Sequence, residues 1–210
     1  MNFYLLLGLS ALLAYLCGGI NAAIILSHAV YHKDIREFGS KNPGFTNFKR
    51  VFGGRCAWFV FVLDLLKTIV PVLCSALLFR HFFGMWQFGA AYAGFFAMLG
   101  HAFPVYYGFK GGKAFTAGAA AVWFVDWRMG LIAAAVFLGL LFTVHIMSLA
   151  SISAAAVCPI SLFFLSPSSW GTLLFCFLSA TLLIVRHHAN IARLIHGKES
   201  KIYLFGKKKA

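Results

Sequence analysis

Two glycines flanked by lysines are the clearest chemical feature of the sequence. The segment 100–113 ends in the run Lys110, Gly111, Gly112 and Lys113. The lysines supply positive charge, and the glycines allow backbone N–H groups to approach an anion at the start of a following helix. We therefore predict that this loop binds the phosphate of a substrate.

The same loop does not match the P-loop of nucleotide-binding proteins. Tyr107 stands where the first P-loop glycine would be, and Ala114 replaces the Ser or Thr that would bind magnesium. Nucleotide hydrolysis is therefore disfavoured. His101, near the start of the loop, is a candidate general base, although a lone His at the end of a membrane span is more often an ordinary hydrogen-bonding group.

A second candidate binding loop lies at 39–50, with the sequence GSKNPGFTNFKR. Small and amide side chains alternate with glycines, so that the backbone can fold tightly and direct N–H groups toward an anion. An ordinary polar loop between two spans would explain this composition equally well. The candidate site residues of this loop are Ser40, Asn42, Thr46, Asn47 and Arg50.

Two further groups of polar residues stand at the ends of apolar segments. Ser148 and Ser151 are three apart and share one helical face, although serines in membrane helices often bond only to their own backbone. The run 186–193 places Arg186, Asn190 and Arg193 on one face, with His187 beside them. Arginines that extend toward lipid phosphates would explain this second group without catalysis.

Acidic residues are too few for a metal site. The chain has five Asp and Glu in total, and Asp64 with Lys67, at i and i+3 inside an apolar segment, can form an ion pair that supports the structure or the site. No carboxylate cluster remains for a divalent metal, which counts against lipid-headgroup transferases that use paired aspartates with magnesium. His101 also lacks the Asp five residues later that soluble-type glycerolipid acyltransferases use, since Tyr106 stands there.

The elements that must position these residues are membrane helices. The chain is 61% hydrophobic and 11% charged, with a mean hydropathy of +0.86, whereas soluble domains carry about 25% charged residues. The net charge of +13 would suggest nucleic acid in a soluble protein. Because the basic residues here lie in short loops beside apolar segments, we expect the lipid bilayer and anionic substrates as partners, and no nucleic acid.

Hydropathy predicts one polytopic domain over 1–210, an all-α integral membrane protein with about seven transmembrane helices. Segments 114–125 and 152–165 are short for a span of about 20 residues, and the count falls to five if they do not cross the bilayer. The predicted spans are about 3–28, 57–79, 88–107, 114–125, 129–146, 152–165 and 170–185.

The distribution of basic residues predicts the orientation. The loop 31–56 and the tail from residue 186 are rich in Lys and Arg, so both are expected to be cytoplasmic. Seven spans then place the N-terminus outside and the C-terminus inside. The terminal Lys207–Lys209 run is expected to be a solvated tail attracted to anionic lipid.

Four motifs, in this order among apolar segments, resemble the PlsY family of bacterial acyl-phosphate:glycerol-3-phosphate acyltransferases over nearly the full chain. They are GSKNPGFTN at 39–47, GHAFPVYYGFKGGK at 100–113, SLAS at 148–151 and RHHANIARL at 186–194. The resemblance implies transfer of a fatty acyl group from acyl phosphate to the sn-1 hydroxyl of glycerol 3-phosphate, giving lysophosphatidic acid and phosphate in phospholipid synthesis. It also implies a bacterial inner-membrane location, a cytoplasmic active site, and no metal or cofactor.

For this reaction Ser40, His101 and Asn190 are the candidates for orienting or deprotonating the acceptor hydroxyl. A phosphate oxygen of the donor is the alternative proton acceptor, which would leave His101 as a positioning group. A transporter or exchanger of an organic phosphate is the alternative function. The sequence departs from the family pattern at positions that affect the fine shape of the phosphate pocket, namely Lys41, Pro43, Thr68, Ala114, Ala117 and Ala189.

Overall fold

The computed structural model describes residues 1–166 and 170–202. Every regular element in these residues is helical, which confirms the predicted all-α class. The elements are α1 (Phe3–Gly19), α2 (Ala22–Tyr31), η1 (Ile35–Glu37), α3 (Phe45–Phe52), α4 (Gly54–Phe83), α5 (Trp86–Ala102), η2 (Val105–Tyr107), α6 (Phe115–Val125), α7 (Trp127–Val144), α8 (Met147–Leu165), α9 (Trp170–Arg186) and α10 (His188–Ile195).

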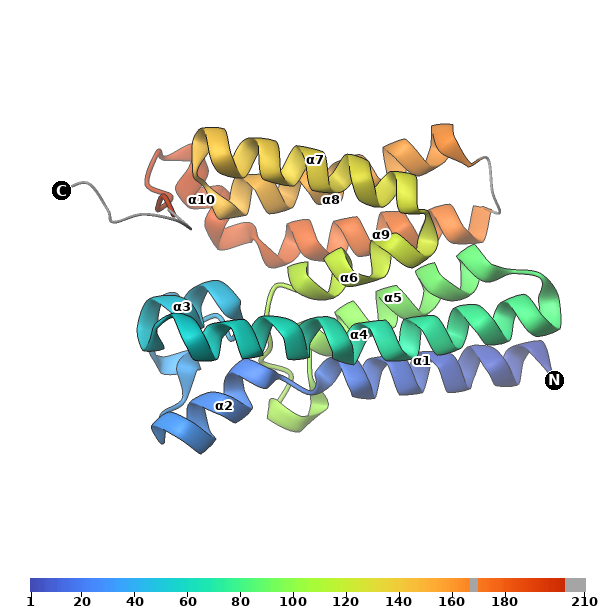
Figure 1. Cartoon of the computed structure of the whole chain (residues 1–210), viewed down its shortest axis with the longest axis horizontal. Helices are drawn as coiled ribbons and strands as arrows, with labels where there is room; N and C mark the ends of the chain where they lie inside the picture. The colour runs from blue at the N-terminus through green and yellow to red at the C-terminus, as the bar shows by residue number, and fades with distance from the viewer. Residues whose placement is uncertain (167–169, 203–210) are drawn as a thin grey trace.

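The long helices form two groups that lie along the long axis of the molecule (Figure 1). Helices α1, α4 and α5 pack on one another, α8 packs against both α7 and α9, and α5 joins the two groups through α9. The short helix α6 contacts members of both groups. A core of small side chains, mostly alanine, allows these helices to approach closely.

Two glycines set the closest of these approaches, between α1 and α5. A Cβ on Gly18 would lie 2.1 Å from the carbonyl oxygen of Ala97, and one on Gly100 would lie 2.0 Å from that of Tyr15. The two helix backbones are therefore in direct contact, as is common where small residues line a membrane helix interface. Because Gly100 is the neighbour of His101, this contact fixes the end of α5 that carries the site.

The apolar segments fit a membrane, but the predicted count of seven full spans is not reproduced. Within residues 1–166 and 170–202, five helical stretches are long and apolar enough, and a sixth results if α9 and α10, bent by 61° at their junction, are taken as one span. The predicted span 152–165 is the longer helix Met147–Leu165. The predicted span 114–125 is α6, whose 11 residues cover only about 16 Å, against a hydrocarbon core of about 30 Å.

The polar segments gather at one end of the molecule. Helices α3 and α10 and the loop that follows α2 lie at that end, opposite the start of α1 (Figure 1). The first apolar stretch, Phe3–Tyr31, breaks at Ile20 and Asn21, where the Asn21 side chain accepts the N–H of Ile24 and so caps α2. The Lys207–Lys209 tail lies outside the described residues.

Candidate active site

A cavity of about 440 Å³ begins among the polar segments and continues between the helices α4 to α9. Its apolar half is lined by aromatic side chains and by small or aliphatic ones, among them Gly94, Ala121, Ala133, Met129 and Ala180. Its polar half holds most of the residues singled out in the sequence. These are Ser40, Asn42, Thr46, Asn47, Arg50, His101, Lys113, Ser148, Ser151, His187 and Asn190.

The first binding loop is shaped by the buried amide of Asn47. Its Oδ1 accepts the N–H of Ser40 at 2.8 Å, and its Nδ2 donates to the carbonyl of Phe38 at 2.9 Å. Gly39 has φ +59, and a Cβ there would lie 2.3 Å from Asn47 Oδ1, so this turn requires glycine. Asn47 therefore holds Ser40 at the cavity, while its own polar atoms are used inside the loop.

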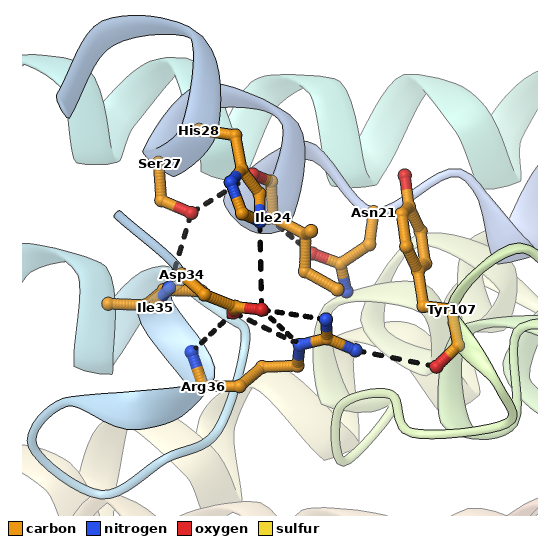
Figure 2. A network of polar contacts seen from close by, with 8 residues as sticks. All are labelled: Asn21, Ile24, Ser27, His28, Asp34, Ile35, Arg36 and Tyr107. Atoms are coloured by element: carbon orange, nitrogen blue, oxygen red, sulfur yellow. Dashed lines mark hydrogen bonds and ion pairs between the residues drawn. The ribbon is translucent and has the colours of Figure 1, made fainter. Parts of the chain in front are cut away.

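A hydrogen bond from Arg36, which is paired with Asp34, links the segment before the first loop to the second loop (Figure 2). The guanidinium of Arg36 donates to both carboxylate oxygens of Asp34, at 2.7 Å for the shortest contact, and to the carbonyl of Tyr107 at 3.3 Å. Hydrogen bonds from Arg36 lower the pKa of Asp34 to about 2 against the effect of burial. His28 lies 3.6 Å from the same carboxylate. The hydrogen bond from Arg36 to Tyr107 therefore links segments that are 71 residues apart in the sequence.

The glycines of the second loop pack against His101. The N–H of Gly112 donates to the carbonyl of His101 at 3.0 Å, and a Cβ on Gly112 would lie 2.2 Å from His101 Nε2. Arg186 donates to the carbonyls of Gly111 and Gly112, both at 3.0 Å, and its guanidinium lies 4.9 Å from the ring centre of Phe103. Arg186 therefore stabilises the conformation of this loop.

This arrangement differs from the phosphate-binding loop predicted at 110–113. The Gly112 N–H is already bonded inside the protein, Gly111 and Arg186 are not part of the cavity lining, and Lys110 is exposed outside it. Lys113 is the lysine of this loop that reaches the cavity. The sequence analysis assigned all four residues of 110–113 to the phosphate site, because spacing alone does not show which side chain a turn directs toward the cavity.

Lys113 is largely buried and donates a hydrogen bond to Asn190 Oδ1. Burial lowers its pKa to about 8, and the nearby Arg193, Arg186 and Arg50 act in the same direction, while Glu199 opposes them. The polar half is therefore rich in positive charge and suited to phosphate. Ala114, which follows, has φ +59, a backbone conformation that favours glycine.

Glu199 completes the polar half and was missed by the sequence analysis. Its Oε1 accepts from Asn190 Nδ2 at 2.6 Å and Ser148 Oγ at 2.9 Å, and its Oε2 accepts from Arg193 Nε at 2.6 Å. Burial raises the pKa of Glu199, but these hydrogen bonds outweigh it and the net pKa is lowered. A lone acid in a basic segment was the signal available in the sequence.

Other predicted residues are placed as follows. Ser151 Oγ donates to the carbonyl of Met147 in its own helix at 2.8 Å, the alternative considered for the serines. His187 Nδ1 lies 2.8 Å from the carbonyl of Leu183. Asp64 and Lys67 form the expected ion pair, with Nζ and Oδ1 2.7 Å apart. Groups of three or more His, Cys, Asp or Glu that could hold a metal are absent from the described residues.

The comparisons with known proteins identify the family of this chain. The family model described as glycerol-3-phosphate acyltransferase matches residues 8–197. A glycerol-3-phosphate acyltransferase of Macrococcus caseolyticus is 37% identical over 93% of this chain and 97% of its own length. One of Jannaschia sp. is 38% identical over 94% of each chain.

Comparison with solved structures identifies the same family. The crystal structure of PlsY, an integral membrane glycerol 3-phosphate acyltransferase, in its glycerol 3-phosphate form matches with a TM-score of 0.84 and 32% identity, over 94% of this chain and 96% of that one. Its lysophosphatidic acid form matches with a TM-score of 0.81 and 31% identity, over 94% of this chain and 95% of that one. The chain therefore belongs to the PlsY family of integral membrane glycerol-3-phosphate acyltransferases.

Proposed function

We propose that the protein transfers a fatty acyl group from acyl phosphate to the sn-1 hydroxyl of glycerol 3-phosphate, releasing phosphate and lysophosphatidic acid. One observation carries the proposal: a single cavity joins a cationic polar half to an apolar half. Both substrates bear phosphate and one bears an alkyl chain, so the two halves match the two chemical parts of the reacting pair. The names of the relatives and their bound forms support the same substrates.

The polar half is suited to holding phosphate groups. Lys113, Arg50 and Arg193 line it and supply positive charge, while Ser40 and Asn42 add polar side chains from the first loop. Charge fixed in a partly buried site stabilises an anion more strongly than it would in water. The cations would hold the acceptor phosphate and also stabilise the phosphate that leaves.

The transfer requires no covalent enzyme intermediate, because acyl phosphate is already an activated anhydride. The acceptor hydroxyl oxygen attacks the carbonyl carbon, a new ester C–O bond forms, and the C–O bond to phosphate breaks. The hydroxyl proton passes to His101 or to an oxygen of the departing phosphate. Ser40, His101 and Asn190 all line the polar half, where they can orient the hydroxyl.

The apolar half would receive the acyl chain. Its lining continues along α5 from His101 to Ala91, a depth of about 15 Å at the rise of an α-helix. Trp58 and Phe61 of α4 line one side and Phe137 of α7 lines another. Trp58 is half exposed on the surface that faces lipid, so an acyl chain can enter from the bilayer.

We further propose a bacterial inner-membrane location with the polar half in contact with the cytoplasm. The basic loop between α2 and α4 and the basic segment after α9 lie at the same end of the molecule (Figure 1). An excess of Lys and Arg in short loops marks the cytoplasmic side. The start of α1 lies at the other end, which would be outside. Cysteine accessibility to a membrane-impermeant thiol reagent, at positions 2 and 198, tests this orientation.

The decisive assay supplies the purified protein in lipid nanodiscs with acyl phosphate and labelled glycerol 3-phosphate. We expect labelled lysophosphatidic acid and an equal amount of phosphate. The Lys113→Ala variant should lose activity by about 100-fold or more, the size of effect seen when a fixed charge-stabilising group is removed. Lys110→Ala should keep most of the activity, since that side chain is exposed outside the cavity. No product above the Lys113→Ala level, at any donor chain length, would refute the proposal.

A further inference from the structure

The Lys67 ammonium joins three elements at the floor of the polar half. It lies 2.7 Å from Asp64 Oδ1, 2.7 Å from the carbonyl oxygen of Ile20, and 3.0 Å from Nδ1 of His101. These partners belong to α4, the break between α1 and α2, and α5. An ammonium has three N–H donors and no acceptor, so Lys67 can only donate toward these partners.

The charge on Lys67 follows from the burial of its partner. The side chains of Asp64 and Lys67 are 1% and 7% exposed. A carboxylate buried this deeply in a membrane protein is strongly unfavourable unless it is paired. The pairing therefore requires a charged Lys67, which can only donate. His101 Nδ1 must then accept, because two facing donors would repel each other.

We infer that the Asp64–Lys67 pair fixes His101 as the neutral tautomer with its proton on Nε2, so that His101 acts on the substrate as a hydrogen-bond donor and not as a base. Nδ1 is occupied by Lys67, and a neutral imidazole then carries its proton on the other nitrogen. Asp64 and Lys67 are the positioning residues in this arrangement. The inference rests on the proposed function for the identity of the substrate, but the tautomer does not depend on it.

The other ring nitrogen is free to meet a ligand. Nε2 lies against Gly112, within the space that a Cβ there would fill, and His101 is part of the cavity lining. Among the described residues no protein acceptor is within hydrogen-bond distance of Nε2. The charged groups that act on the ring are Lys67 from α4 and Arg186 from α9, both cationic, and the carboxylate of Asp64 is already paired with Lys67. An added proton on the ring would therefore be repelled.

This tautomer has a consequence for the reaction. An Nε2–H donor can stabilise a phosphate oxygen or the oxyanion that develops on the acyl carbonyl, and it cannot accept the hydroxyl proton. The hydroxyl proton then goes to an oxygen of the departing phosphate. This is one of the two proton acceptors that the sequence left open, the other being His101. Asp64 and Lys67 thus act on the reaction through His101.

The first experiment reads the tautomer directly and needs no activity. The protein is labelled with ¹⁵N in the histidine rings, and the His101 signals are identified among the eight histidines as those missing in His101→Gln. We expect a protonated Nε2 and an unprotonated Nδ1 near neutral pH. The neutral double variant Asp64→Asn/Lys67→Met leaves no unpaired charge and should give a mixture of tautomers. A proton on Nδ1, or on both nitrogens, in the unaltered protein would overturn the inference.

The second experiment separates a donor from a base by activity. In His101→Gln the side-chain amide can present an N–H near the position of Nε2, but it cannot take up a proton. We expect His101→Gln to stay within about tenfold of the unaltered kcat and His101→Ala to fall by about 100-fold, with the KM for glycerol 3-phosphate little changed in both. If His101→Gln is folded and as inactive as His101→Ala, the donor role is wrong. If no acyl transfer occurs at all, the proposed function fails while the ¹⁵N result still decides the tautomer.

Discussion

The two halves of the cavity are built in opposite ways. The polar half combines side chains from segments far apart in the sequence, as in the hydrogen bonds from Ser148 to Glu199 and from Lys113 to Asn190. The apolar half is lined by helix faces that carry small side chains, among them Gly94, Ala121 and Ala133. The polar half depends on directional hydrogen bonds that involve charged groups, and the apolar half depends on empty volume.

This difference teaches how one cavity can recognise two unlike chemical groups. A phosphate needs fixed charges at definite positions, so a small displacement in the polar half should change the rate. An alkyl chain needs room, so the apolar half should respond to side-chain size and change the preference for chain length. Changes at the two halves are therefore expected to have separable effects.

The largest effect is expected from Gly112→Ala in the polar half. The new Cβ would lie 2.2 Å from His101 Nε2 and would displace the ring. We expect a loss of about 100-fold in kcat, equivalent to losing one fixed donor, measured as lysophosphatidic acid formed. Gly139→Ala in α7 is the control, since its Cβ would meet no atom within 4 Å. Equal rates in the two variants would contradict the placement of His101.

The next effect concerns pH, again at the polar half. Burial lowers the pKa of Lys113 to about 8, so its charge is present below that value and is lost as pH rises through it. We expect kcat/KM for glycerol 3-phosphate to fall about tenfold per pH unit above this value. Lys113→Arg should lack this fall, because a guanidinium stays charged. A fall that is identical in Lys113→Arg would assign it to another group.

A change in the apolar half should alter chain preference instead. Ala133 of α7 lines the cavity, and Ala133→Leu would fill part of it. We expect kcat/KM to shift by about tenfold in favour of shorter acyl phosphates, with the KM for glycerol 3-phosphate unchanged. Ala135→Leu, on the exposed side of the same helix, is the matched control. If both variants keep the original chain preference, the acyl chain lies elsewhere.

The smallest effect is expected at the link between the loops. Asp34→Asn removes the charge that Arg36 pairs with, at the partly exposed edge of the site. We expect less than about a threefold loss of activity, because such pairs contribute little. Arg36 lowers the pKa of Asp34 to about 2. The contribution of this ion pair to stability is therefore present at neutral pH and is lost as pH falls toward that value. Thermal unfolding of both proteins over acidic pH measures this.

The sequence predicted the segments that form the site more accurately than the individual residues that line it. Eleven of the fifteen candidate residues line the cavity, since loops of unusual composition were recognisable without a structure. It could not separate Lys113 from Lys110, because the turn at the glycines decides which lysine points inward. It also missed Glu199, whose partners lie 51 residues and 9 residues away in the chain.

The sequence by itself determined an all-helical membrane protein, the family, and the segments that carry phosphate-binding chemistry. These follow from composition and local motifs, which do not depend on how helices pack. Tertiary structure alone decided that Gly111 and Gly112 pack against His101. It also decided that Lys67, paired with Asp64, contacts His101. These features are contacts between distant segments, and only packing sets their distances.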